Sequence, residues 1–99
     1  MTIDGSLCHA ARALTHVSRD ILARASGVSA AAIESFERGT STPDLPVIKL
    51  IQAALEDLGA VFIPEDHLGQ GVRLKFTKLD VKQIRRLEGE GGAVGDDDV

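Results

Sequence analysis

The run SRDILARASGVSAAAIESFERG, residues 18–39, constrains the fold more than any other part of this chain. Two short segments with helical spacing of their apolar residues meet there at Gly27, where the first segment must end. Each segment opens on a serine, Ser18 or Ser29, whose hydroxyl can accept a hydrogen bond from a backbone N–H of the first turn. We therefore expect two short helices, over about residues 18–26 and 29–38, joined by a tight turn.

The apolar side chains of this run indicate which faces the two helices bury. Leu22, Ile33 and Phe36 should face a shared core, and Val28 places one apolar side chain in the turn. Gly27 suits the turn because glycine adopts positive φ without a Cβ clash. The pattern predicts a helix-turn-helix, an arrangement that in DNA-binding proteins presents its second helix to the major groove.

Two more helices are predicted on either side of this pair. The first should cover about residues 6–14, with Leu7, Ala10, Ala11 and Leu14 on one face. The last should begin at residue 45 or 46, after Pro43 has interrupted helical structure, and should end at residue 58, before Gly59. Its predicted core positions are Val47, Leu50, Ile51, Ala54, Leu55 and Leu58.

Beyond Gly59 the sequence pattern changes to that of strands. Residues 60–63 form a short apolar run, and apolar and basic residues alternate over residues 71–76, so a β-hairpin is predicted. A lone two-stranded hairpin is marginal in water, so it should lie against the helices or pair with a second copy. The residues expected to support a homodimer there are Val61, Ile63, Val72, Leu74 and Phe76.

The remaining residues divide into a short helix and a tail. Asp80 and Gln83 have the spacing of a capping box, which predicts a helix over residues 81–87. Residues 89–99 are rich in glycine and aspartate and should form a disordered acidic tail. The expected fold is mainly α, with four or five helices and a C-terminal two-stranded hairpin. Its expected divisions are residues 1–58, 59–88 and 89–99.

Composition narrows the classes of function. Cys8 is the only cysteine, which excludes an internal disulfide and favours a reducing, cytoplasmic location. The N-terminus lacks the pattern of a secretory signal, and no apolar run approaches the roughly 20 residues of a membrane span. The net charge is −4, but five acids and no base follow residue 87. Residues 1–87 hold eleven bases against ten acids, so one copy should bind DNA weakly.

The helical part resembles the lambda-repressor-like, Cro-type family of DNA-binding domains, also called the xenobiotic-response-element family. The resemblance covers about residues 7–58, and residues 59–76 look like a hairpin appended in one bacterial subgroup. It implies a transcriptional regulator of bacterial or phage type that binds double-stranded DNA as a homodimer and needs no cofactor. The matching residues are AARAL at 10–14, Leu22-Ala23, ASGVS at 25–29, Ile33, FERG at 36–39 and Thr42-Pro43.

The resemblance also implies which residues read DNA bases: Ala30, Ala31 and Ser35. Family members are expected to carry glutamine, asparagine or arginine there, because these side chains form paired hydrogen bonds with base edges. Alanine can only touch a thymine methyl group, and serine offers one hydroxyl. Two interpretations stay open: recognition through thymine contacts and DNA shape, or a helix without base readout that serves as a scaffold or protein surface.

Other residues are expected to contact phosphates or to hold the helices together. Arg19 can grip a phosphate at the start of its helix or can simply be a solvated surface arginine. Glu34 can accept from a cytosine amino group or repel phosphate. The resemblance aligns Arg12 and Glu37 with an ion pair that joins the first helix to the third. The complete predicted DNA-binding set is Ser18, Arg19, Ser29, Ala30, Ala31, Glu34, Ser35, Arg38, Thr40, Ser41 and Thr42.

Catalytic and metal sites are not expected. Cys8, His9 and His16 lack metal-ligand spacing, and Cys8 and His16 lie about two helical turns apart, too far for a nucleophile and its base. The alternative to a DNA-binding regulator is a protein-binding adaptor on the same scaffold, such as an anti-activator or an antitoxin-like subunit. Its partner would be another regulatory protein, and no membrane partner is expected.

Overall fold

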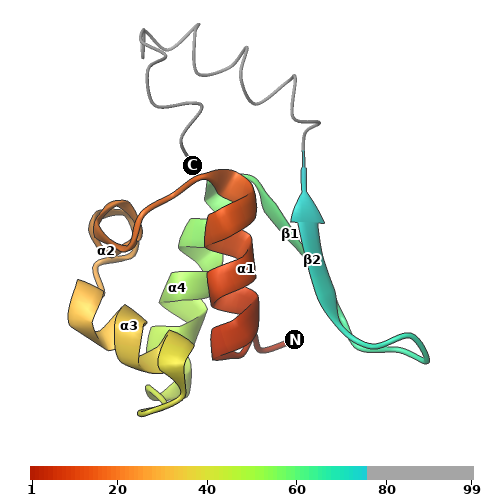
Figure 1. The fold of residues 1–99 in the computed structure, drawn as a ribbon, viewed down its shortest axis with the longest axis horizontal. Helices are drawn as coiled ribbons and strands as arrows, with labels where there is room; N and C mark the ends of the chain where they lie inside the picture. The colour runs from red at the N-terminus through yellow and green to blue at the C-terminus, as the bar shows by residue number, and fades with distance from the viewer. Residues whose placement is uncertain (76–99) are drawn as a thin grey trace, which may run out of the picture.

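The computed structural model describes residues 1–75, in which four α-helices are followed by a two-stranded antiparallel sheet (Figure 1). The predicted fold is confirmed at this level. The helix predicted over residues 81–87, the tail at 89–99 and Phe76 lie outside the described residues. The elements are α1 (Gly5–Thr15), α2 (Arg19–Ser26), α3 (Ala30–Arg38), α4 (Leu45–Asp57), β1 (Ala60–Ile63) and β2 (Gly71–Leu74).

The two central helices begin and end where the sequence predicts. Ser18 Oγ accepts a hydrogen bond from the Ile21 backbone N–H, and Ser29 Oγ accepts one from Ala32, each at 3.1 Å. Gly27 ends α2 with φ at 79°, in the left-handed region that favours glycine. Both predicted serine caps and the predicted turn glycine are therefore confirmed.

The start of α1 differs from the prediction by one residue. Asp4 caps the helix, because its Oδ1 accepts a hydrogen bond from the Leu7 backbone N–H at 2.9 Å. The helix consequently begins at Gly5. This glycine is required there, since a Cβ on residue 5 would collide with the carbonyl oxygen of Phe36. The missing side chain lets the first turn of α1 pack directly against the backbone at the end of α3.

The core lies between α1, α4 and the α2–α3 pair, and the hairpin flanks α1 on the opposite side (Figure 1). Leu22 and Ile33 are completely buried, and Phe36 and Val28 are nearly so, as predicted. The largest fully buried side chains are Leu22, Ile33, Ile51, Leu55 and Cys8.

The predicted core face of α4 is wrong at two positions. Leu50 is 52% exposed and Leu58 is also exposed, whereas Ile48, which the prediction left out, is only 6% exposed. The buried line runs through Ile48, Ile51 and Leu55, at spacings of three and four residues. Leu50 lies about 100° around the helix from Ile51, outside that line. The predicted face of α1 is also shifted, because Cys8 and Thr15 are buried while Ala10 and Leu14 are only half-buried.

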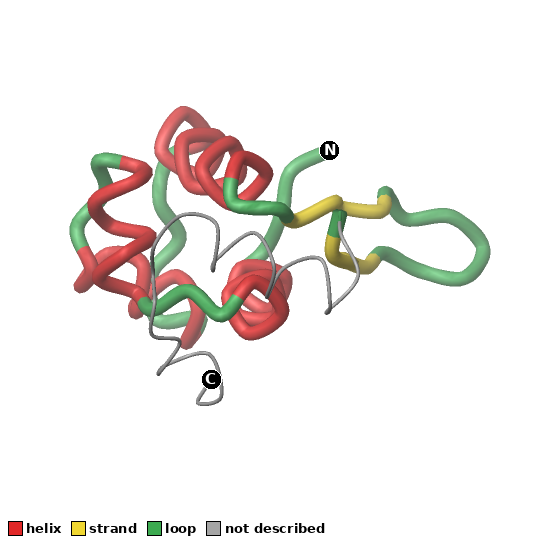
Figure 2. Tube along the Cα trace, turned by 90° about the horizontal axis from the view of Figure 1, so that it is seen from above, coloured by secondary structure: helices red, strands yellow, loops and turns green. Residues whose placement is uncertain are grey.

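The hairpin packs one face of its sheet against the helices and projects its loop away from them (Figure 2). Phe62 pairs with Val72 in the register, and both side chains pack against the core. Val61 and Ile63 alternate with Phe62, so they lie on the outer face. The residues predicted to form one dimer surface thus occupy opposite faces of the sheet, with Val72 and Leu74 turned toward the helices.

Candidate nucleic-acid interface

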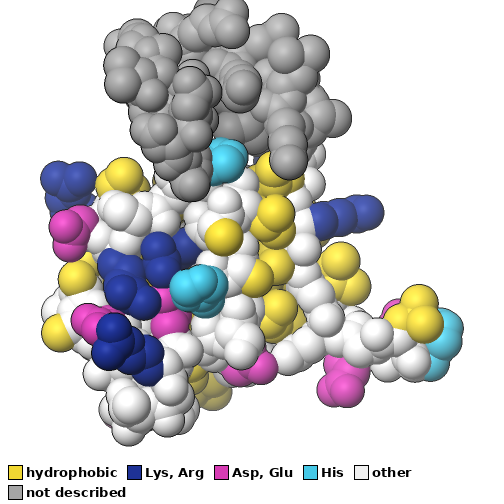
Figure 3. All heavy atoms as spheres, viewed as in Figure 1, with side chains coloured by type: hydrophobic (Ala, Val, Ile, Leu, Met, Phe, Trp, Pro, Cys, Tyr) yellow, Lys and Arg dark blue, Asp and Glu magenta, His cyan; other side chains and the backbone are white. Residues whose placement is uncertain are grey.

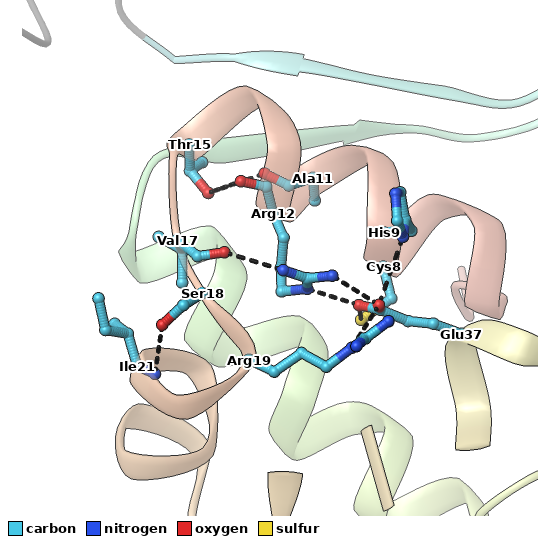
Figure 4. A network of polar contacts seen from close by, with 10 residues as sticks. All are labelled: Cys8, His9, Ala11, Arg12, Thr15, Val17, Ser18, Arg19, Ile21 and Glu37. Carbon is cyan, nitrogen blue, oxygen red and sulfur yellow. Dashed lines mark hydrogen bonds and ion pairs between the residues drawn. The ribbon is translucent and has the colours of Figure 1, made fainter. Parts of the chain in front are cut away.

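A single carboxylate, Glu37 at the end of α3, connects the first three helices (Figure 4). Its side chain is only 1% exposed. Arg12 of α1 donates two hydrogen bonds to it, from Nε to Oε2 and from Nη2 to Oε1, each 2.7 Å long. The predicted ion pair between Arg12 and Glu37 is therefore confirmed, and its two parallel bonds fix the orientation of both groups.

Glu37 has further partners that the sequence analysis did not anticipate. Arg19, at the start of α2, donates from Nε to Oε1 at 3.1 Å, and the Cys8 thiol donates to Oε2 at 3.1 Å. His9 Nδ1 lies 3.4 Å from Oε1. Arg12 also donates from Nη1 to the carbonyl of Val17, between α1 and α2. We call Cys8, His9, Arg12, Arg19 and Glu37 the Glu37 cluster.

The cluster changes the titration of its members. Burial alone would raise the pKa of Glu37, but hydrogen bonds from Arg12 and Cys8 and the charge of Arg12 outweigh it and lower the pKa to about 2. The hydrogen bond to Glu37 raises the pKa of Arg12. Burial, followed by the hydrogen bond to Glu37, raises the pKa of the Cys8 thiol. Cys8 therefore acts as a neutral hydrogen-bond donor and lacks the thiolate character of a nucleophile.

The outer side of α3 carries the residues predicted to read bases. Ala31 in the first turn is exposed, while Ala30 and Ser35 are half-buried. Glu34 forms an ion pair with Arg38 one turn later, at 2.9 Å, with side chains 41% and 65% exposed. These residues share one helix, but Glu34 and Arg38 neutralise each other.

The hydroxyl groups predicted to meet phosphates have several different environments. Those of Ser18 and Ser29 are already used as helix caps. Thr40 donates from its hydroxyl and from its backbone N–H to the carbonyl of Ser35, which closes the end of α3. Ser41 and Thr42 are exposed in the loop before α4.

Basic side chains gather on the surface formed by α1, α2 and α3, with acidic side chains interspersed among them (Figure 3). Three arginines of this surface pair with carboxylates: Arg12 and Arg19 with Glu37, and Arg38 with Glu34. Arg24 on α2 forms no ion pair within the part of the chain that the structure describes. Residues 1–58 hold five bases against seven acids, so the helices offer a surface of mixed charge without an excess of cations.

Within residues 1–75, no three histidine, cysteine, aspartate or glutamate side chains are grouped so that they could hold a metal ion. The same residues include no helix with the length and hydrophobicity required to cross a membrane. Among known proteins, neither a family model nor a curated protein matches the chain.

Proposed function

We propose that this protein is a sequence-specific, DNA-binding transcriptional regulator of the lambda-repressor-like kind, in which α2 and α3 form a helix-turn-helix. The observation that carries the proposal is the pairing of two serine-capped helices at a left-handed Gly27, with Ala31 exposed in the first turn of the second helix. In DNA-binding proteins of this kind, that first turn enters the major groove.

The Glu37 cluster supports the proposal because a recognition helix must be held at a fixed angle to read bases. Glu37 belongs to the last turn of α3, and its partners come from both α1 and α2. Movement of α3 relative to the other helices would separate buried charged groups, which is costly. The cluster thus fixes α3 without using any of its outward-facing residues.

Arg19 is the residue that we propose as the main phosphate contact. Its Nε donates to Glu37, and arginine has four further N–H donors on its terminal nitrogens. These donors lie at the start of α2, where the unpaired backbone N–H groups also favour an anion. Contacts from Ser41 and Thr42 would extend the phosphate surface beyond α3, and Ala31 would meet a thymine methyl group.

A homodimer would place two copies of α3 in successive major grooves, about 34 Å apart. We propose that the copies associate through the hairpin, whose outer face exposes Ile63 and half-exposes Val61. Within residues 1–75, both strands of this two-stranded sheet also have an edge that pairs with no other strand, and a strand of a second copy can complete it.

The proposal is tested with Ala31→Asp, which places a negative charge at the exposed first turn of α3. Binding to DNA from upstream of the protein's own gene is measured by gel shift across a salt series. The parent should bind with an affinity that falls steeply as salt rises, and Ala31→Asp should bind at least tenfold more weakly. The matched control is Ala53→Asp, because Ala53 is an exposed alanine on α4. Unchanged binding by Ala31→Asp would mean that α3 is not in the groove.

One set of observations favours a protein-binding adaptor as the second candidate. Residues 30–32 at the start of α3 are all alanines, and Arg12, Arg19 and Arg38 already have carboxylate partners. If the parent binds no DNA at low salt, α3 is better explained as a protein-contacting helix.

A further inference from the structure

His9 is a member of the Glu37 cluster to which the proposed function gives no role. Its Nδ1 lies 3.4 Å from Glu37 Oε1, and Arg19 Nε donates to the same oxygen at 3.1 Å. Figure 4 shows the two side chains reaching the carboxylate from different helices, His9 from α1 and Arg19 from α2. Because both nitrogens lie within 3.4 Å of one oxygen atom, they are separated by less than twice that distance. His9 therefore lies beside the arginine that we propose as the main phosphate contact.

Both side chains can reach a ligand in solvent while they contact the buried carboxylate. The side chain of His9 is 62% exposed and that of Arg19 is 32% exposed, whereas that of Glu37 is only 1% exposed. His9 directs Nδ1 toward Glu37, so its other ring nitrogen, Nε2, is the one that can contact a ligand. A phosphate group has several oxygens and accepts bonds of about 2.8 Å from charged nitrogens. It can therefore bridge two donors that lie this close together.

The charge of the cluster favours an anion at this point. Two arginines and one carboxylate give the cluster one net positive charge, because the Cys8 thiol is neutral. Protonation of His9 increases this charge to two. Glu34, which lies one turn earlier on α3, is already paired with Arg38 at 2.9 Å. The unpaired backbone N–H groups at the start of α2 add to the attraction.

His9 is the only member of the cluster that changes its charge between about pH 6 and pH 8.5. The pKa of Glu37 is about 2, the pKa of the Cys8 thiol is raised by burial and by its bond to Glu37, and arginine stays protonated in proteins. Histidine side chains ordinarily titrate at about pH 6.5. In a neutral ring whose proton is on Nδ1, facing Glu37, Nε2 has no proton to donate. Only the imidazolium form can donate to Glu37 and to a phosphate at the same time.

We propose that His9 and Arg19 together bind one phosphate group of the DNA backbone, and that His9 does so as the imidazolium. The inference rests on the proposed function for its ligand, and it adds to the Arg19 contact a second residue from a different helix. A proton on His9 is favoured in the complex, so the contact is complete below about pH 6.5 and is lost as the pH rises above this range. Because the contact is to phosphate, it strengthens binding without selecting a sequence.

The test measures how DNA affinity depends on pH. Dissociation constants for a 30-base-pair duplex of random sequence are measured by fluorescence anisotropy from pH 6 to pH 8.5, between 50 and 200 mM salt. The parent should bind roughly fivefold more tightly per chain at pH 6 than at pH 8.5, since a tenfold preference for the protonated form is typical of one pKa unit. Its salt slope should be steeper at pH 6 by about one unit per chain. His9→Gln should lose most of both effects.

Two further variants control the measurement. His67→Gln removes another exposed histidine, in the hairpin loop, and should keep the pH dependence of the parent. His9→Arg carries a permanent charge and should bind at pH 8.5 about as tightly as the parent does at pH 6. Thermal denaturation checks that each variant is folded. Equal pH dependence in the parent and His9→Gln would overturn the inference, and so would a loss of affinity in His9→Gln that is the same at every pH.

The experiment separates this inference from the proposed function. If Ala31→Asp weakens DNA binding but His9→Gln keeps the pH dependence of the parent, only the inference fails. If Ala31→Asp binds like the parent and His9→Gln loses the pH dependence, the phosphate contact stands and only base reading by α3 fails.

A second probe decides the case in which the parent binds no duplex, a result that overturns the proposed function. The ring resonances of the histidines are then followed by NMR during a titration with inorganic phosphate at pH 6. A saturable shift at His9 and none at His67 would support the phosphate site with a small phosphate as its ligand. No shift at His9 would overturn the site as well.

Discussion

Glu37 is the residue on which the arrangement of the first three helices depends. Its carboxylate receives hydrogen bonds from α1 through Arg12 and Cys8 and from α2 through Arg19, yet it is almost inaccessible to solvent. A buried carboxylate without such partners would be unstable as an anion. Removing a strongly bonded partner of Glu37 should therefore lower the free energy of unfolding by more than the removal of a surface ion pair does.

A double-mutant cycle measures the strength of the pair. Arg12→Ala and Glu37→Ala should each lower the free energy of unfolding by about 3–5 kcal/mol, because each change leaves a buried charge with weaker compensation. The double variant should lose less than the sum of the two. The control is the exposed pair of Glu34 and Arg38, for which the same cycle should give a coupling of about 1 kcal/mol or less. Strict additivity in the Arg12–Glu37 cycle would contradict the pairing.

Lowering the pH should decrease the free energy of unfolding, because the same carboxylate of Glu37 becomes protonated. The pKa of Glu37 is about 2 in the folded protein, below the ordinary value of 4.5, so its contribution is complete above about pH 4.5 and is lost as the pH falls toward 2. The shift corresponds to roughly 3 kcal/mol. In urea unfolding between pH 7 and pH 2, Glu37→Gln should flatten this part of the stability profile. A profile parallel to the parent's would mean that other carboxylates dominate.

A prediction at Gly5 concerns steric fit and does not involve charge. Gly5→Ala places a Cβ against the Phe36 carbonyl oxygen and must push α1 away from α3. We expect a loss of more than about 2 kcal/mol in the free energy of unfolding, a cost typical of strain in a packed core. The neighbouring Ser6→Ala is the control, because Ser6 is exposed. Thermal denaturation of both variants checks the prediction, which fails if Gly5→Ala melts with the parent.

At the scale of elements, local signals predicted the α2–α3 pair correctly. Serine caps and a turn glycine depend on interactions between residues only three or four positions apart, so the sequence alone predicts them. Ile48 was missed for the opposite reason. Alternative apolar faces of α4 are almost equally plausible from spacing alone, and only the position of α1 and α2 selects one of them. Leu50 therefore fits the pattern and still faces solvent.

The sequence likewise predicts only some of the contacts in the candidate site. The pairing of Arg12 with Glu37 was expected from the resemblance, while the contributions of Cys8 and Arg19 were not. Cys8 carries no signal as a hydrogen-bond donor, since a buried cysteine usually behaves as a small apolar residue. Arg19 was considered only as a phosphate ligand or a surface residue, and its contact with Glu37 depends on the angle between α2 and α3.

The hairpin gives a prediction about association. Ile63→Lys adds a charge to the exposed outer face without disturbing the packing of Phe62 and Val72 on the other face. Light scattering should report a dimer for the parent and a monomer for Ile63→Lys, with unchanged helical circular dichroism. Leu68→Lys, at the hairpin loop where the leucine is 83% exposed, is the control and should remain dimeric. A dimeric Ile63→Lys would place the interface elsewhere.

At the scale of the whole molecule, opposite charges follow one another along the C-terminal part of the sequence. In the sequence, the five acids after residue 87 follow six bases between residues 73 and 86, and they should compete with phosphates for these bases, because opposite charges attract over about 10 Å at ordinary salt. Among the described residues, the buried core of α1 to α4 is built from side chains between Ile3 and Ala60.

Deletion of residues 89–99 should therefore tighten binding to random-sequence DNA several-fold and leave the melting temperature unchanged. Asp96→Asn/Asp97→Asn/Asp98→Asn is the companion variant, because it keeps the chain length and removes three of the charges. Anisotropy titrations and thermal denaturation of both proteins test the idea. Weaker DNA binding after deletion would show that the tail assists the contact.

Asp4 joins two parts of the molecule that are far apart in the sequence. Its Oδ1 caps α1 through the Leu7 N–H, while its Oδ2 accepts a hydrogen bond at 2.9 Å from the side chain of Gln70, 66 positions later. Separation of the hairpin from α1 thus removes one restraint on the residue that holds the first turn of the helix. The opening of the helix end and the undocking of the hairpin become linked events in one cooperative unit, and amide hydrogen exchange at Leu7 reports on both.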